Sequence, residues 1–260
     1  MSDRARPRLR RRRLLAGVGA AGTLMLGGCD RLMQDEHVRN VLGRTEALTR
    51  WFQRLVGSRH ALAPTYTEAD LSPSFRGNGT IDPDDDDYQE LASKNFEGWQ
   101  LEVGGLVRNP ATFSLAELRT MPARTQITRH DCVEGWSCIG KWTGVPLGAV
   151  LQQVGLQPEA RYIVFQCADP MTPGRPESKY YESIDLDDAF HLQTILAYDM
   201  NGQVLSVQHG APLRLRVERQ LGYKMAKYVM RIEAVDSLKR IGGGKGGYWE
   251  DLGYTWYAGI

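Results

Sequence analysis

The chain has 260 residues, of which 42% are hydrophobic and 24% charged, and its formal net charge at pH 7 is +1. This composition is that of a globular protein able to form a full core. The near balance of charge does not favour a nucleic-acid-binding protein, which would carry an excess of lysine and arginine.

The first 28 residues have the composition of an export signal. Seven arginines between positions 4 and 13 precede an apolar stretch at 14–28, which is shorter than the roughly 20 residues that span a bilayer. The paired arginines directly before Leu14 resemble a twin-arginine signal, which exports folded proteins. The run that ends in Cys29 resembles a lipobox, in which this cysteine is acylated and becomes the mature N-terminus. We therefore expect residues 1–28 to be a signal peptide; the alternative is a basic leader with an incidental cysteine.

A signal peptide at residues 1–28 predicts the location and the net charge of the mature protein. Asp30, directly after Cys29, resembles the signal that retains lipoproteins on the inner membrane. We therefore expect a periplasmic protein anchored to the inner membrane through a lipid on Cys29. Removal of residues 1–28, which carry seven arginines and one aspartate, changes the net charge from +1 to −5 and leaves no basic excess.

The number of remaining cysteines predicts a free thiol. Cys132, Cys138 and Cys167 follow Cys29, and an odd number leaves at least one cysteine unpaired within the chain in an oxidising compartment. Such a thiol either has a use or is buried. The alternative is a disulfide between Cys138 and one of the other two, with the third cysteine inert.

Residues 29–69 are expected to hold an N-terminal helix and a linker. Apolar residues recur at helical spacing over 36–57. Residues 58–98 are rich in Pro, Asp, Asn and Gly and predict a long irregular segment that wraps the core or has a function. The main domain is expected at 70–241.

The main domain is predicted to alternate short strands and helices. Residues 101–106 predict a strand, Ser114 opens a helix with a capping box, and a strand near Ile127 delivers His130 to Cys132. Further elements are predicted as a helix at 146–154, a buried strand at 162–167, a helix at 185–190, a hairpin at 201–202, and strands at 213–217 and 229–235. Mixed strands and short helices without a regular βαβ rhythm predict an α+β fold with mixed sheets in a single domain.

Residues 242–260 form a glycine-rich and aromatic tail. The run at 242–247 predicts a flexible linker rather than a phosphate loop, because no Ser or Thr follows Lys245. The aromatic residues after it either pack back on the domain or face a partner.

Three stretches carry residues suited to a redox cofactor. Cys132 lies in the loop at 132–137, and a single soft sulfur in such a loop is a suitable ligand for a redox metal. The stretch at 209–227 combines Arg214 on a strand with lysines after a glycine turn, which predicts either an anion site or a hairpin with surface cations. Residues 74–79 form another loop with a cation and an amide.

The Cys132 loop, the His-Gly-x-Pro-x-Arg strand at 209–214 and the Gly-x-Lys-x-x-Lys turn at 222–227, in this order, resemble the molybdopterin-binding domain of the sulfite oxidase family, over most of residues 70–236. The form Cys-Val-Glu-x-Trp-Ser is similar to the bacterial branch that contains the periplasmic methionine-sulfoxide reductase catalytic subunit. The resemblance implies a sulfite-oxidase-type molybdopterin-binding fold and a molybdenum–molybdopterin cofactor, with Cys132 as the protein ligand of the metal. The further cofactor contacts that it implies are Phe75, Arg76 and Asn78 at the pterin, Cys167 or Asp169 beside it, His209 and Arg214 at its polar edge, and Met225, Ala226 and Lys227 around its phosphate.

The departures from the family are informative. Glu134 and Trp136 replace the arginines that follow the cysteine in sulfite oxidases, and a carboxylate there disfavours a dianion such as sulfite. Glu134 is the second expected catalytic residue, which handles protons or excludes anions; the alternative is a solvated acid. Glu218 stands where the family often has Pro, and we expect it to alter a turn but not the site. The chain is expected to lack the immunoglobulin-like dimerisation domain.

The predicted function is an exported molybdopterin oxidoreductase that performs two-electron oxygen-atom chemistry on a small or protein-borne substrate. No Cys-x-x-Cys-His motif for a c-type haem is present. We therefore expect electron exchange with a separate protein, a cytochrome or a membrane haem or quinone subunit. Two alternatives stay open: a sulfite dehydrogenase-like enzyme, and a non-catalytic lipoprotein that keeps the fold.

Overall fold

The part of the chain that the computed structural model describes is Leu48, Trp51, Phe52 and residues 60–260. The chain divides into two compact units, Met1–Gln53 and Arg54–Ile260, and all the elements below belong to the second. The expected signal peptide, its lipid-bearing cysteine and most of the expected N-terminal helix lie outside the described residues. Among the helices that are described, none is both long and apolar enough to cross a membrane.

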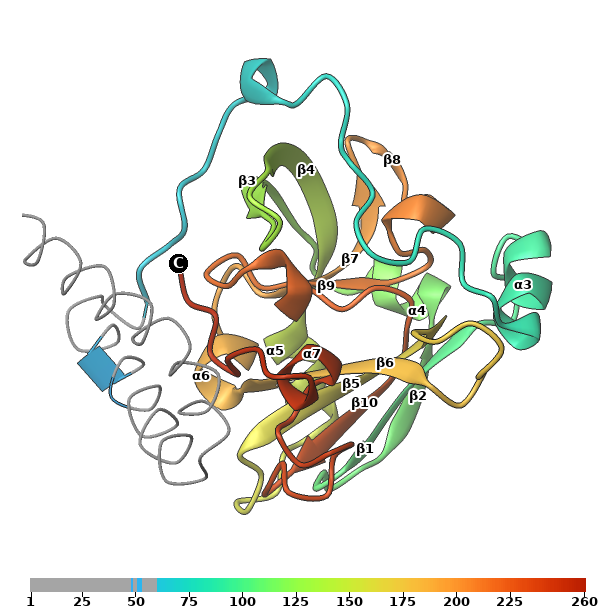
Figure 1. The fold of residues 1–260 in the computed structure, drawn as a ribbon, viewed down its shortest axis with the longest axis vertical. Coiled ribbons are helices and arrows are strands. Elements are labelled where there is room, and N and C mark those ends of the chain that lie inside the picture. Colours follow the sequence, from blue (N-terminus) through green and yellow to red (C-terminus); the bar gives the residue numbers. More distant parts are fainter. Residues whose placement is uncertain (1–47, 49–50, 53–59) are drawn as a thin grey trace, which may run out of the picture. The chain divides into compact units, whose positions relative to one another are not determined.

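Two five-stranded sheets form the body of the described domain (Figure 1). The first has the order β2-β1-β10-β5-β6, in which β1 and β10 run parallel and the other pairs antiparallel. The second has the antiparallel order β3-β4-β7-β8, and β9 also pairs with β7. The strands are β1 Gln100–Gly105, β2 Ala111–Ser114, β3 Arg124–Asp131, β4 Ser137–Pro146, β5 Tyr162–Pro170, β6 Lys179–Asp185, β7 Ile195–Met200, β8 Gln203–Val204, β9 Arg214–Arg216 and β10 Val229–Val235.

The helices are short and connect the strands. They are α3 Asp86–Ser93, α4 Leu115–Thr120, α5 Leu147–Val154, α6 Leu186–Ala189 and α7 Tyr248–Asp251, with 3-10 turns η1 Glu68–Asp70, η2 Val207–His209 and η3 Gly222–Lys224. Ser114 opens α4 with the predicted capping box, in which its hydroxyl accepts from Glu117 N at 3.2 Å and Glu117 Oε2 accepts from Ser114 N at 2.7 Å. Mixed sheets joined by short helices confirm the α+β expectation.

The predicted helix at 146–154 is α5, and its apolar face enters the core. The side chains that it buries completely are Leu147, Val150, Leu151 and Val154. Burial of each such side chain contributes roughly 1.5–3 kcal/mol, so packing rather than propensity sustains this eight-residue helix. Gly155 ends it with φ 67°, a conformation that glycine adopts without strain.

The strand expected near Ile127 is β3, which delivers His130 and Cys132 as predicted. It continues to Asp131 and pairs antiparallel with β4, so that His130 lies opposite Cys138. Residues 132–136 form the turn between the two strands. The cysteine therefore follows directly on a well-paired strand end, which is a rigid support for a functional loop.

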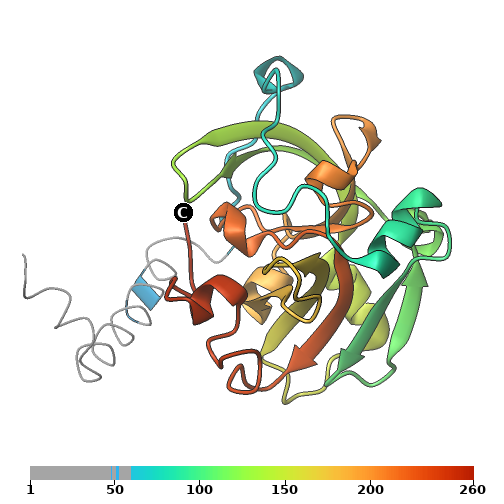
Figure 2. The same ribbon diagram turned by 45° about the vertical axis from the view of Figure 1, so that its right-hand side comes forward.

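The long irregular segment expected at 58–98 runs along the outside of the domain, over the part that is described. It passes β3 and β4 before it reaches α3 (Figures 1 and 2). Tyr66 N donates to Ile127 O at 3.0 Å, which ties the segment to β3. The composition does not predict α3 inside this segment; there Asp85 caps the N-terminus by accepting a backbone hydrogen bond.

The glycine run at 242–247 is folded, so the expectation of a flexible linker is wrong. The backbone N–H groups of Gly243 and Lys245 donate to the Asp251 carboxylate at 2.6 and 2.9 Å. Gly242, Gly244 and Gly246 have φ values of 53°, 93° and 92°, which glycine alone adopts readily. The glycines therefore bend the chain around a carboxylate of the same chain.

The aromatic tail packs back on the domain, as one of its two interpretations expects. Trp256 Nε1 donates to Ser183 Oγ at 2.8 Å, and Leu221 N donates to Ala258 O at 2.9 Å. The helix α7 lies against β6 (Figure 1). The tail thereby reaches the cavity that contains Cys132.

Candidate functional site

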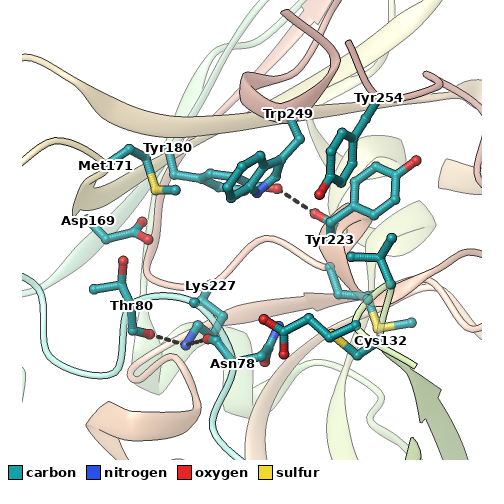
Figure 3. Close-up of a pocket in the computed structure, with 15 residues that line it drawn as sticks. Asn78, Thr80, Cys132, Asp169, Met171, Tyr180, Tyr223, Lys227, Trp249 and Tyr254 are labelled. Carbon is teal, nitrogen blue, oxygen red and sulfur yellow. Dashed lines mark hydrogen bonds between the residues drawn. The ribbon is translucent and has the colours of Figure 1, made fainter. Parts of the chain in front are cut away.

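A cavity of about 150 Å³ lies between the Cys132 turn, the end of β5 and the C-terminal tail (Figure 3). Its lining residues are Asn78, Gly79, Thr80, Cys132, Val133, Glu134, Asp169, Met171, Tyr180, Gly222, Tyr223, Met225, Lys227, Trp249 and Tyr254. The predicted site residues that it brings together are Asn78, Cys132, Glu134, Asp169, Met225 and Lys227. The predicted residues that do not line it are Phe75, Arg76, Cys167, His209, Arg214 and Ala226.

The Cys132 thiol is half-buried at the cavity wall. Its backbone is held by a turn, in which Cys132 N donates to Trp136 O at 2.9 Å and Gly135 N donates to Cys132 O at 3.0 Å. Burial raises the pKa of the thiol, the Glu134 carboxylate adds to the increase, and Arg76 opposes it. Cys132, Cys138 and Cys167 are all free thiols, so the disulfide interpretation is not supported.

Glu134 lies between the cavity and solvent. Trp136 Nε1 donates to Glu134 Oε2 at 2.8 Å, and Arg76 Nη2 lies 4.0 Å from the same oxygen. The Arg76 guanidinium also lies 5.3 Å from the centroid of the Trp136 ring. Since the Arg76 and Glu134 side chains are 65% and 59% exposed, their ion pair contributes at most about 1 kcal/mol. The tryptophan is therefore the main support of this carboxylate.

A buried layer of charged side chains supports the Cys132 turn from behind. His130 Nδ1 accepts from Arg216 Nη1 at 3.0 Å, and Arg216 makes a bidentate pair with Glu218 at 2.9 and 2.5 Å. Burial and then Arg216 lower the pKa of His130 well below its ordinary value. A neutral imidazole that accepts at Nδ1 carries its proton on Nε2, and among the described residues this atom has no hydrogen-bond partner.

Glu218 lies in a turn, as expected, and its side chain also has a buried partner that the sequence did not predict. Its carboxylate is fully buried, and it accepts from Arg216 and from Gln126 Nε2 at 2.9 Å. Because Arg216 in turn contacts His130, Glu218 acts on a residue two positions before Cys132. Sequence reasoning missed this because a carboxylate at a turn gives no indication of its partner.

Phe75, His209 and Arg214 form a second layer beside His130. The Phe75 ring centroid lies 5.7 Å from the rings of both His130 and His209. His209 Nδ1 is 2.8 Å from Ser206 Oγ and its Nε2 is 3.1 Å from Phe75 O, so both ring nitrogens have partners within the protein. His209 therefore orients the backbone of the segment that contains Phe75.

Arg214 is a buried cation with spare hydrogen-bond donors. It is 1% exposed, and its Nη1 donates to His209 O at 2.9 Å. Its Nε and Nη2 atoms have no partner among the described residues. Burial and Arg216 lower the pKa of Arg214 to about 9. Unpaired buried donors are costly, so this guanidinium has unused capacity for a polar ligand.

Lys227 lines the cavity, but its ammonium group is bound by backbone carbonyls. Its Nζ donates to Asn78 O at 2.7 Å, to Thr80 O, and to Gln208 O at 3.3 Å (Figure 3). Burial and Arg214 lower the pKa of Lys227 to about 7. The side chain therefore holds the segment at 78–80 against the domain. Ala226 does not reach the cavity, and its carbonyl accepts from Leu215 N at 2.8 Å.

The resemblance left open whether Cys167 or Asp169 lies beside the cofactor, and the positions of the two side chains favour Asp169. Cys167 is 2% exposed and packs in the hydrophobic core, whereas Asp169, two residues further along β5, lines the cavity. Burial raises the pKa of Asp169 to about 7, although Lys227 and the Thr80 hydroxyl oppose the increase. A carboxyl group with this pKa carries a proton part of the time at neutral pH.

Lys224 fits neither of the two interpretations of its stretch, because it belongs to no anion site and does not lie at the surface. It is fully buried, and its Nζ donates to Glu182 Oε1 and, at 2.6 Å, to Glu250 Oε1. Both carboxylates lie on elements remote in sequence. Its partners are therefore internal, and its ammonium faces away from any ligand.

Several lining residues were not predicted. They are Gly79, Thr80, Val133, Met171, Tyr180, Gly222, Tyr223, Trp249 and Tyr254. Only glycine fits at position 222, because the His130 ring packs against its backbone and a Cβ there would lie 2.4 Å from His130 Nε2. The aromatic tail was the one visible signal for Trp249 and Tyr254, and its composition cannot indicate which surface it covers.

Comparisons with known proteins identify the family of the domain that contains this cavity. Residues 89–240 match the family model described as the oxidoreductase molybdopterin binding domain. A putative protein-methionine-sulfoxide reductase subunit of Azospira oryzae is 37% identical over 250 residues, which cover 96% of this chain and 87% of that protein. The protein-methionine-sulfoxide reductase catalytic subunit of Ralstonia nicotianae is 41% identical over 145 residues, which cover 53% of this chain and 44% of that protein.

A solved structure shows the same fold. The sulfane dehydrogenase SoxCD of Paracoccus pantotrophus has a TM-score of 0.50 and 22% sequence identity, covering 73% of this chain and 52% of that chain. This likeness confirms the expected sulfite-oxidase-type architecture. Together with the family match over residues 89–240, it establishes that this chain belongs to the family of oxidoreductases with a molybdopterin-binding domain.

Proposed function

We propose that this oxidoreductase uses molybdenum–molybdopterin to reduce a neutral sulfoxide, either small or carried on a protein. The character of the cavity beside Cys132 carries the proposal. Glu134 and Asp169 line it with carboxyl groups, and the ammonium of Lys227 is bound by backbone carbonyls. The Glu134 carboxylate between the cavity and solvent repels an anion such as sulfite but not a neutral sulfoxide. The names of the Azospira and Ralstonia relatives describe this class of reaction.

The described residues fit such a cofactor. Cys132 offers a soft sulfur to a redox metal, and metal binding removes its proton. The spare donors of Arg214 and the Nε2–H of His130 are orphaned polar atoms that a buried pterin would satisfy. We assign to the cofactor, besides these, the predicted residues Phe75, Arg76, Asn78, Asp169, His209, Met225, Ala226 and Lys227.

The overall reaction consumes two electrons and two protons, and it releases the sulfide and one water. When bound, the cofactor supplies the two-electron change and the transfer of oxygen. Cys132 would hold the metal at the cavity wall, and Glu134, supported by Trp136, excludes anions from the entrance. Asp169 is a buried carboxyl group that holds a proton part of the time at neutral pH. It lies on the side of the cavity opposite Cys132 (Figure 3).

The proposed function is tested by purification from a host that makes molybdopterin. We expect about one molybdenum per chain, reduction of methionine sulfoxide with a reduced viologen dye as electron donor, and negligible sulfite oxidation. Rapid sulfite oxidation would instead identify a sulfite dehydrogenase-like enzyme. Absence of molybdenum would identify a non-catalytic lipoprotein and refute the proposal.

Replacement of Glu134 by glutamine will strengthen inhibition by anions. A unit charge pair 4 Å apart interacts by about 1 kcal/mol in water, so loss of the carboxylate should lower the inhibition constant of sulfite about fivefold. The measurement is the sulfite inhibition of sulfoxide reduction at fixed pH and ionic strength. Glu177→Gln, at an exposed position, is the control and should leave the constant unchanged. An unaltered constant in Glu134→Gln disproves anion exclusion by this residue.

The electron donor and the location are further parts of the proposal. We propose that a separate redox protein, a cytochrome or a membrane haem or quinone subunit, supplies the electrons. The name of the Ralstonia relative, a catalytic subunit, implies an enzyme with more than one subunit. The basic, apolar leader supports export to the periplasm, with a lipid on Cys29 as the anchor to the inner membrane.

Replacement of arginines 10–13 by lysine will block export. The twin-arginine route requires the arginine pair, while the total charge stays constant in this variant. Cell fractionation should find the variant in the cytoplasm and the unaltered protein in the membrane fraction. Cys29→Ser should be exported but released from the membrane. Normal export of the lysine variant would contradict a twin-arginine signal.

A further inference from the structure

Three elements that line the cavity each carry an ionisable side chain close to a lining residue. The pairs of lining residue and ionisable neighbour are Tyr223 and Lys224 in η3, Tyr180 and Glu182 in β6, and Trp249 and Glu250 in α7. The ionisable neighbours meet behind the cavity wall, where Lys224 Nζ donates to Glu182 Oε1 and to Glu250 Oε1 at 2.6 Å. We name Lys224, Glu182 and Glu250 the Lys224 cluster.

The side chains of the Lys224 cluster are buried, and their ion pairs join three elements of the fold. The three side chains are at most 1% exposed. Burial raises the pKa of Glu182 well above its ordinary value against the attraction of Lys224, and the Glu250 carboxylate adds to the increase. A buried ion cluster adds little net stability, because desolvation offsets the attraction. Removal of one member nevertheless leaves an unpaired buried charge, so the cluster strongly favours one arrangement of its three elements.

The arrangement that it favours is an aromatic wall. Trp249 and Tyr254 stack with ring centroids 5.3 Å apart, and Tyr254 meets the Tyr223 ring edge-on at 5.2 Å. Tyr223 Oη donates to Thr255 O at 2.8 Å, which joins η3 to the tail. Figure 3 shows the three rings on the side of the cavity opposite Asn78 and Lys227.

We propose that Trp249 and Tyr254 determine which sulfoxides the enzyme accepts, and that the Lys224 cluster positions them. The inference rests on the proposed sulfoxide reductase function and deepens it. Aromatic faces contact apolar groups and sulfur favourably, so the wall selects a neutral sulfoxide with an apolar or aromatic arm. Anionic or strongly hydrated substrates gain nothing from it.

The role of the wall is tested by selectivity. We compare kcat/KM for methyl phenyl sulfoxide with that for dimethyl sulfoxide, both reduced with a viologen dye. Trp249→Ala should lower the ratio about tenfold, as expected for loss of an aromatic contact, while the molybdenum content stays constant. An equal effect on both sulfoxides, or none, overturns the assignment of Trp249 as a specificity residue.

The role of the Lys224 cluster is tested by hydrogen exchange of the full chain. In Lys224→Met, peptides that cover residues 248–254 should exchange at least tenfold faster than in the unaltered protein, while peptides from β5 keep their protection. The selectivity ratio should fall as in Trp249→Ala. Lys239→Met, at an exposed lysine, is the matched control and should change neither.

A triple variant separates positioning from general damage. Lys224→Met with Glu182→Gln and Glu250→Gln removes all three charges together, and it should recover most of the protection and of the selectivity. Unaltered exchange and selectivity in Lys224→Met overturn the positioning role. If the unaltered enzyme reduces no sulfoxide, the proposed function fails instead. Hydrogen exchange then still tests whether the Lys224 cluster positions the tail. Calorimetric binding of methyl phenyl sulfide to Trp249→Ala then still tests whether the aromatic wall binds an aromatic arm.

Discussion

Replacement of Cys132 by serine will remove molybdenum from the protein and abolish turnover. A serine hydroxyl is a hard ligand that stays protonated at neutral pH, whereas a thiolate is the soft donor that a redox metal of this kind requires. The half-buried thiol lies at the cavity wall on a turn supported by β3 and β4. We expect the metal content of Cys132→Ser to fall from about one atom to almost none per chain, measured by inductively coupled plasma mass spectrometry.

The control for this experiment is Cys138→Ser. Cys138 is also a half-buried free thiol, and it lies on β4 opposite His130 without lining the cavity. This variant should keep both its molybdenum and its activity. Retention of molybdenum in Cys132→Ser, or its loss in Cys138→Ser alone, would refute Cys132 as the metal ligand.

Replacement of Glu218 by alanine will destabilise the protein by about 3–5 kcal/mol at pH 7, as is typical when one member of a buried ion pair is removed. Both side chains of the Arg216–Glu218 pair are 0% exposed, so no water reaches the guanidinium left behind. Since whole domains are stable by only about 5–15 kcal/mol, the loss is a large fraction of the total. We expect Tm to fall by roughly 6–20 °C in differential scanning calorimetry.

Two further variants show whether the buried charge causes this loss. Glu102→Ala removes a carboxylate from an exposed pair with Arg231, at 3.9 Å, and should change stability by less than about 1 kcal/mol. The double variant Arg216→Met with Glu218→Leu replaces the buried pair by apolar groups and should recover most of the stability. A Glu218→Ala protein as stable as Glu102→Ala would show that the pair is unimportant.

The elements that sequence reasoning predicted well depend on local patterns. The capping box at Ser114, the φ > 0 turn at Asn201 and the apolar periodicity of α5 each involve residues a few positions apart, and each is present as expected. The Cys132 loop is of the same kind, because strand, cysteine and turn are contiguous. Its recognition identified the family that the comparisons confirm.

The sequence did not reveal the roles of charged side chains whose partners are far away in the chain. Lys224 was expected either at an anion site or at the surface, but Glu182 and Glu250 bind it in the interior. Glu218 was expected to matter only for a turn, but it pairs with Arg216 behind His130. A charged residue has the same appearance in the sequence whether it faces solvent or a buried counterion, so its role could not be deduced.

The sequence by itself determined the fold class through local periodicity. Its contiguous motifs resemble one family, and that resemblance implied Cys132 as the candidate metal ligand. Only the tertiary structure decided what surrounds that thiol. It placed Asp169 rather than Cys167 at the cavity and brought Trp249 and Tyr254 to its wall from the far end of the chain. Burial and long-range pairing are properties of the packed chain, and no local pattern encodes them.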